Sequence, residues 1–230
     1  MMKSCLISIL VSLVSFTAAW GQASGTQVTE TDSTLTLRNS KVRVEFPKGE
    51  AFDISKLTLN GKELVLSKGY NTVPWTLTYK GPQGENPVLF PSHGEYAGWA
   101  KTTKDGHVAI AFKWNMRLTY QDLVPVVMTV SLPGDSELAY WDIQAGTPDG
   151  WLVSNTQFPR ITVTRPDKAK LITSAGWGAE YNLSNPQVYT SSYPSVTGSM
   201  QLLFLHNPDG SVYYATEDRE ACGKDFRAAV

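Results

Sequence analysis

The sequence has very little cysteine and no excess of charge of either sign. Of its 230 residues only two are cysteines, Cys5 and Cys222, and Cys5 lies in an apolar leader. A single remaining thiol forms no internal disulfide, so the domain depends on its hydrophobic core for stability. A net charge of -1 and a pI of about 6.3 exclude the usual electrostatic driving force for binding nucleic acid or an anionic membrane surface.

Motifs for catalysis and metal binding are also missing. The three histidines, His93, His107 and His206, are far apart in the sequence and form no metal-binding spacing. There is no nucleophile elbow, no phosphate-binding loop and no dinucleotide-binding glycine pattern. Sequence spacing places no two carboxylates at the separation that glycoside hydrolysis needs. We therefore assign no catalytic residue, no metal ligand and no cofactor, and expect the histidines to make ordinary hydrogen bonds in strands or turns.

The first residues predict export from the cytoplasm. A short basic start precedes an apolar run from Cys5 to Phe16, and small residues follow at Thr17–Ala19. This order is typical of a secretory signal peptide, and the run is short for a membrane span. We expect residues 1–21 to be a signal peptide and residues 22–32 to be a flexible polar leader. The mature protein would be secreted or periplasmic and would have no membrane contact after cleavage.

Alternating apolar and polar residues dominate the rest of the chain, and no segment shows a capped helical period. Asn60-Gly61 between two alternating segments is a strong hairpin signal, because both positions of that turn need positive φ. Many short strands separated by Gly, Pro and Asp indicate a sandwich or barrel. We expect an all-β domain over residues 33–226, a large two-sheet antiparallel β-sandwich. The predicted strands are Leu35–Arg38, Val42–Phe46, Ile54–Leu59, Lys62–Leu66, Trp75–Tyr79, Val108–Trp114, Met116–Tyr120, Val124–Leu132, Glu137–Gln144, Ile161–Thr164, Leu171–Ser174, Met200–His206 and Ser211–Glu217.

Tryptophans and tyrosines fall into two groups. Trp75, Trp114 and Trp141 lie in alternating strands, which predicts that they belong to the core. Other aromatic residues lie in Gly-, Ser- or Pro-rich stretches, where a rigid scaffold can present them to a ligand. Their flat apolar faces suit stacking on sugar rings, especially beside an acidic group. The candidate substrate-binding residues are Trp151, Trp177, Glu180 and Tyr193, and the competing interpretation is that these aromatic rings close the ends of the sandwich or pack on another domain.

The last quarter of the chain resembles a known group of proteins. Ala175-Gly176-Trp177-Gly178 is followed by Tyr193-Pro194-Ser195, by Met200-Gln201 and by Tyr213-Tyr214-Ala215-Thr216-Glu217-Asp218. This order is similar to the end of the N-terminal β-supersandwich, of the galactose-mutarotase-like kind, in bacterial glycoside hydrolases and uncharacterised relatives. Endo-α-N-acetylgalactosaminidases are distant relatives of that group. Glu217 stands where the group more often has histidine, so a role of that histidine does not carry over.

The resemblance implies a catalytic (β/α)₈ barrel after the sandwich. The chain stops where such a barrel would begin, and residues 227–230 would be the start of the downstream region. We therefore expect a non-catalytic N-terminal sandwich of a secreted glycoside hydrolase-like enzyme. It would brace its own downstream catalytic domain and contact a polysaccharide or oligosaccharide.

Three alternatives remain open from the sequence. The chain could be a stand-alone carbohydrate-binding module that uses the same loop aromatics. It could be an enzyme like aldose 1-epimerase, which needs an acid and a base near the sugar ring, although neither His93 nor His107 has the expected context. An accessory sandwich of a polysaccharide lyase is the third alternative.

Overall fold

The computed structural model describes residues 25–48, 54–64, 73–120, 122–161, 168–175, 178–183, 188–195, 198–206, 211–216 and 223–229. Within these residues the chain consists of β-strands and one 3₁₀ turn, η1 (Pro91–His93), and the sheets are antiparallel. The prediction of an antiparallel all-β protein is thus confirmed. Among the residues described, no helix is long and apolar enough to cross a membrane. The expected signal peptide and Trp177 lie outside the described residues.

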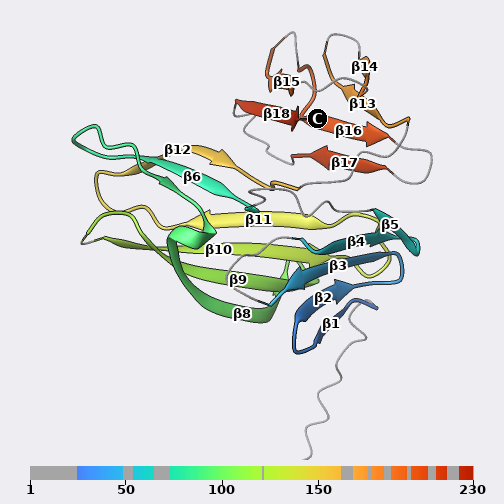
Figure 1. Cartoon of the computed structure of the whole chain (residues 1–230), viewed down its shortest axis with the longest axis horizontal. Helices are drawn as coiled ribbons and strands as arrows, with labels where there is room; N and C mark the ends of the chain where they lie inside the picture. The colour runs from blue at the N-terminus through green and yellow to red at the C-terminus, as the bar shows by residue number, and fades with distance from the viewer. Residues whose placement is uncertain are drawn as a thin grey trace, which may run out of the picture.

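The first three sheets form one unit, which we call the first unit (Figure 1). The amino-terminal sheet has the strand order β1 (Gln27–Glu30), β2 (Thr34–Arg38), β3 (Val42–Pro47), β4 (Lys56–Leu59) and β5 (Lys62–Leu64). The central sheet has the order β11 (Tyr140–Ala145), β10 (Leu123–Leu132), β9 (His107–Arg117) and β8 (Gly94–Lys104). The short sheet has the order β12 (Leu152–Gln157), β6 (Thr76–Lys80) and β7 (Val88–Leu89).

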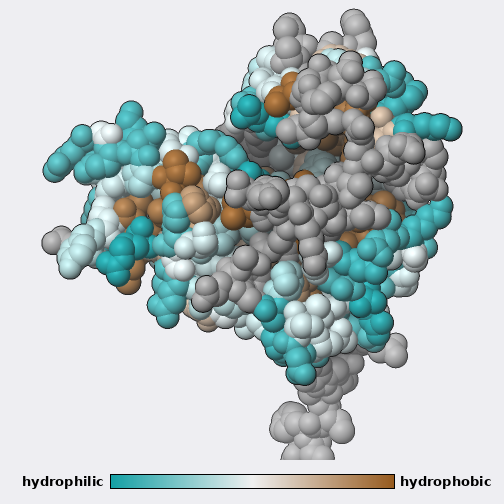
Figure 2. Space-filling view, in the orientation of Figure 1, coloured by the Kyte–Doolittle hydropathy of each residue, from teal (hydrophilic) through white to brown (hydrophobic). Residues whose placement is uncertain are grey.

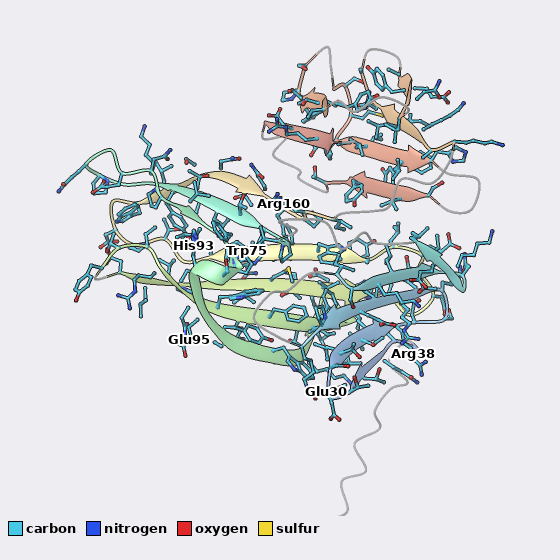
Figure 3. All side chains as sticks on the ribbon, in the orientation of Figure 1. Glu30, Arg38, Trp75, His93, Glu95 and Arg160 are labelled. Carbon is cyan, nitrogen blue, oxygen red and sulfur yellow. The ribbon has the colours of Figure 1, made fainter. Side chains whose placement is uncertain are left out.

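The core of the first unit lies on one face of the central sheet. Phe46 of the amino-terminal sheet contacts Phe112 of β9, with ring centroids 4.9 Å apart. Trp75, just before β6, contacts Trp114 of β9 at 5.4 Å, and Trp75 lies inside this unit in Figure 3. The amino-terminal and short sheets therefore both pack on the central sheet. Trp75 and Trp114 are buried, and Trp141 is half-buried against the same core, as the alternation predicted.

Two further sheets form a second unit, above β11 and β12 in Figure 1. The distal sheet has the order β14 (Ala179–Asn182), β13 (Lys170–Thr173), β16 (Leu202–His206) and β17 (Val212–Ala215). A two-stranded sheet pairs β15 (Val188–Tyr193) with β18 (Lys224–Ala229). The two sheets share a small core around Leu171, Leu203 and Tyr189, which is separate from the core of the first unit.

The prediction of one two-sheet sandwich differs from this arrangement. The described strands form five separate sheets, placed more like blades than like two continuous layers (Figure 1). The amino-terminal sheet and the short sheet both lie against the same side of the central sheet. The distal and two-stranded sheets have their own core. A periodicity of two shows which side chains of a strand share a face. It does not show which strands pair into one sheet, so the strand order was not predictable from alternation.

Several strands differ from their predicted bounds. β1 lies within the stretch expected to be a flexible leader, and it pairs with β2 from Gln27↔Arg38 to Glu30↔Leu35. Val108–Trp114 and Met116–Tyr120 belong largely to one strand, β9, which ends at Arg117. β8 was missed because it is rich in Gly, Ala, Thr and Lys, and because a bulge at Gly98 interrupts its alternation. The strands β7, β12, β14, β15 and β18 were also not predicted.

The hairpin at Asn60-Gly61 is confirmed. Asn60 has φ 49° and Gly61 has φ 77°, as a type I′ turn requires. The turn fixes the register in which Leu59 pairs with Lys62. Because a one-residue slip would move every side chain of a strand to the other face, this turn determines which residues of β5 face the core.

We expect Gly61→Ala to lower the free energy of unfolding by about 1 kcal/mol, since alanine is strained at positive φ. Gly25→Ala is the matched control, because Gly25 has no positive φ and no atom within 4 Å of an added Cβ. Urea denaturation of both variants measures the difference. Equal stability of the two variants would contradict the argument.

Candidate functional site

One face of the distal sheet gathers aromatic and charged side chains in the open. In β16, Leu203 and Leu205 belong to the core of the second unit, so the alternating residues Phe204 and His206 lie on the other face. In β17, Tyr214 packs against the core, whereas Tyr213 is 49% exposed on the outer face. We call this outer surface the aromatic face, and it comprises Lys170, Ile172, Glu180, Asn182, Phe204, His206 and Tyr213.

The strand register aligns the residues of the aromatic face in rows that run across the strands. Ile172 of β13 pairs with Glu180 on one side and with Phe204 on the other. Phe204 in turn pairs with Tyr213 of β17. One row therefore crosses all four strands from an acidic end to an aromatic end. The next row places Lys170 between Asn182 and His206.

The rings of the aromatic face are close together but leave accessible surface. The Phe204 and His206 centroids are 5.9 Å apart and their planes differ by 13°. The Phe204 and Tyr213 centroids are 6.3 Å apart at 61°. His206 is exposed and Phe204 is half-buried. Neighbouring rings hold one another in place, so the exposed tyrosine ring is a preformed contact surface.

The charged edge of the aromatic face is held by an ion pair. Lys170 Nζ lies 2.6 Å from Glu180 Oε1, and both side chains are about half exposed. An exposed pair of this kind contributes little to folding stability. It does orient the ammonium group, which pairs across the sheet with His206, and the carboxylate on the neighbouring edge strand. Nδ1 of His206 lies 3.1 Å from Oγ of Ser211, which positions the imidazole at the end of β16.

The opposite side of the distal sheet explains why this face stays open. The two-stranded sheet covers that side, with Tyr189, Phe226 and Ala228 packed on the small core. Burial raises the pKa of Tyr214, the neighbour of Tyr213 that points inward. The Tyr189 hydroxyl donates a hydrogen bond to the Asn182 carbonyl oxygen, at 3.1 Å. The polar edge of the aromatic face is thus tied to the core beneath it.

This combination of groups suits a ligand that has both an apolar face and hydroxyl groups. Aromatic rings supply large apolar contact area at low conformational entropy cost. The carboxylate of Glu180 accepts hydrogen bonds, the amide of Asn182 both donates and accepts, and the ammonium of Lys170 donates. A pyranose ring has C–H groups on one face and hydroxyls around its rim, so it matches such a surface. Among the described residues, no group of three or more His, Cys, Asp or Glu side chains could hold a metal ion.

The structure brings only one described candidate from the sequence to this face. Glu180 lies on it, in β14. Tyr193 is half-buried at the end of β15, on the same side of the strand as the buried Tyr189 and Ser191, and so faces away from it. Trp151 lies in the first unit, just before β12, and Figure 1 shows β12 far from β14. Trp177 lies outside the described residues.

Trp151 is packed on its neighbours. It is half-buried against the core of the first unit. A Cβ on Gly81 would lie 2.8 Å from its ring, so Gly81 allows the ring to approach the β6–β7 connection closely. Its backbone N–H donates to the Pro148 carbonyl oxygen at 3.0 Å. These contacts agree with the interpretation in which loop tryptophans close the end of the fold.

The sequence interpretation overlooked Phe204, His206 and Tyr213 as site residues. It treated β16 as a uniformly apolar strand, although aromatic and aliphatic residues alternate in it. The alternation Leu203, Leu205 against Phe204, His206 was the available signal. The other histidines are elsewhere: the His93 ring in η1 contacts the ring of Phe90 at a tilt of 42°, and His107 stacks on Tyr140 of β11.

Comparison with known proteins adds a relation for the whole chain. No family model matches it. It is 37% identical over 224 residues, or 96% of its length, to a protein of Bacteroides thetaiotaomicron named "Putative glycoside hydrolase". The alignment covers 33% of that protein, so the chain spans about a third of the relative's length. The aligned part of the chain includes both units described above. The chain is therefore a homologue of one third of a protein that carries the name of a glycoside hydrolase.

Proposed function

We propose that this chain is a non-catalytic, glycan-contacting portion of a secreted carbohydrate-active protein. The observation that carries the proposal is the aromatic face, on which an exposed tyrosine, Tyr213, and an oriented carboxylate, Glu180, lie at opposite ends of one row. The relation to the Bacteroides protein supports a carbohydrate ligand in general terms. Hydrolysis would belong to the two thirds of such a protein that this chain does not match. Export would follow from the signal-peptide pattern of residues 1–21.

We also infer that the first unit derives from a galactose-mutarotase-like supersandwich. What supports this is that one long four-stranded sheet is packed on a single face by two other sheets. Fold relation does not determine function, so the glycan proposal does not depend on this inference. A solved structure of the matching third of the Bacteroides protein with a different strand order would contradict this inference.

Binding of the purified chain to polysaccharides tests the proposed function. Affinity electrophoresis through gels that contain neutral plant, bacterial and mucin-type glycans gives one retardation value for each polymer. We expect clear retardation by at least one polymer, and no rate of glycoside cleavage above the buffer control. Absence of retardation across the whole panel would contradict the proposal. Retardation of the isolated chain would also show that glycan binding needs no other domain.

The carboxylate of the aromatic face gives a sharper prediction. We expect Glu180→Gln to weaken binding of the retarding polymer roughly three- to tenfold, because it removes a charged acceptor worth about 1 kcal/mol. Glu137→Gln is the matched control, since Glu137 is also a half-exposed partner of a lysine, at 3.9 Å from Lys41, but lies in the first unit. Equal affinities of the two variants would remove Glu180 from the site.

A further inference from the structure

The row of the aromatic face that ends in Tyr213 has a definite length. It runs from Glu180 through Ile172 and Phe204 to Tyr213, with one residue on each of four neighbouring strands, and we call it the long row. Neighbouring strands of a sheet lie about 4.8 Å apart, so three strand intervals separate the two ends of the row by about 14 Å. A pyranose unit of an extended chain is about as long as one strand interval. The long row therefore matches about three consecutive sugar units.

The long row is open at both ends. The strands β14 and β17 are the two edges of the distal sheet, so among the described residues no strand continues past Glu180 or Tyr213. Both residues are exposed. A chain that lies on the row can therefore extend beyond either end. This geometry suits the middle of a chain, whereas recognition of a chain end needs a concave site with a closing wall.

The two sides of the long row differ in polarity. A polar row of Asn182, Lys170 and His206 lies two residues further along the strands, about 7 Å away. On the other side Leu202 pairs with Ala215, and Ala215 is exposed. Figure 2 shows the same mixture on the visible side of the second unit, where hydrophobic patches border hydrophilic residues. A sugar chain on the long row thus meets hydrogen-bonding groups along one edge and apolar groups along the other.

We propose that the aromatic face binds an internal segment of a glycan chain, about three sugar units long, which lies along the long row and across the strands. The inference rests on the proposed function for the ligand class and adds the length and direction of the bound segment. The Tyr213 ring stacks on the unit at one end. Ile172 and Phe204 contact the apolar face of the middle unit. Glu180 accepts hydrogen bonds from hydroxyls of the unit at the other end.

Calorimetric titration with sugar chains of graded length tests this inference. The probes are size-fractionated mono- to hexasaccharides, obtained by partial acid hydrolysis of the polymer that retards the full chain in electrophoresis. We expect the trisaccharide to bind about tenfold more tightly than the monosaccharide, or better, because each of the first three units adds a contact with the row. From the trisaccharide to the hexasaccharide we expect a gain of less than about fivefold, since further units extend past the row.

The Glu180→Gln variant shows whether one bound chain reaches both ends of the row. We expect it to weaken the trisaccharide about three- to tenfold and to leave the mono- and disaccharide within about twofold of the parent chain. The reason is that a short ligand on Tyr213 ends before β14. Glu137→Gln in the first unit is the matched control and should leave the affinity for every length unchanged. Both carboxylates are about half exposed, so both variants should keep the thermal midpoint of the parent chain.

The outcomes separate this inference from the proposed function. A monosaccharide that binds as tightly as the trisaccharide would overturn the inference, and so would a Glu180→Gln variant that weakens both lengths equally. A gain of more than about fivefold from the trisaccharide to the hexasaccharide would overturn it as well, because that gain needs a surface longer than the row. Each of these results leaves polymer retardation, and with it the proposed function, intact. Absence of retardation by every polymer overturns the proposed function and this inference together.

Discussion

Trp114→Ala is expected to lower the free energy of unfolding by about 3–5 kcal/mol, the usual cost of removing a fully buried large aromatic ring. Trp114 is 1% exposed. Its ring contacts Trp75 at 5.4 Å, Tyr96 at 5.8 Å and Phe112 at 6.4 Å. It therefore lies where the short sheet meets the central sheet. Its loss leaves a cavity between two rigid sheets, which collapse poorly onto it.

Aromatic side chains surround Trp114, so its removal takes away many packing contacts at once. Burial, with the charge of Glu30 as a second cause, raises the pKa of Tyr96 to about 12. We expect Trp114→Phe to recover part of the lost stability, since it restores apolar volume without restoring the indole's full contact area.

Urea denaturation measures this effect, and Tyr120→Ala is the control. Tyr120 is also an aromatic residue of the first unit, but it is 91% exposed. Its removal should change the free energy of unfolding by less than about 0.5 kcal/mol. A Trp114→Ala variant that loses less than about 1 kcal/mol would mean that the two sheets do not share one core.

The core of the first unit was predictable because its strands alternate cleanly. In β9, Val108, Ile110 and Phe112 are buried on one face, and this period alone marked the strand and its inner side. The Asn60-Gly61 turn was equally clear, because its φ values follow from residue type. By contrast, β8 forms through pairing with β9 over ten residue pairs although its own sequence favours strand weakly. Long-range pairing decides such segments.

The candidate site was predictable only in part for a related reason. Sequence shows that Tyr213 and Tyr214 point to opposite faces of a strand. It does not show which face another sheet covers. The two-stranded sheet settles that question by placing Tyr189 and Phe226 against the side of Tyr214. Glu180 could be chosen as a candidate because an acid beside aromatic residues is visible in sequence, whereas the exposure of Tyr213 follows from tertiary packing.

Tyr213→Ala is expected to weaken binding of the retarding polymer at least tenfold, which corresponds to about 1.4 kcal/mol or more. Exposed aromatic anchors of this kind contribute most of the affinity at small contact surfaces. Tyr213 is 49% exposed, so the variant should keep the stability of the parent chain. Affinity electrophoresis with the same polymer, next to urea denaturation, measures both quantities.

Two neighbouring variants show whether the tyrosine ring itself makes the contact. Tyr213→Phe keeps the ring and should retain most of the affinity, because stacking does not depend on the hydroxyl. Tyr214→Ala removes the inward-facing neighbour, which packs on the core of the second unit, and should instead lower stability. A Tyr213→Phe variant as weak as Tyr213→Ala would point to the hydroxyl as the binding group. Full affinity of Tyr213→Ala would exclude the aromatic face from glycan binding.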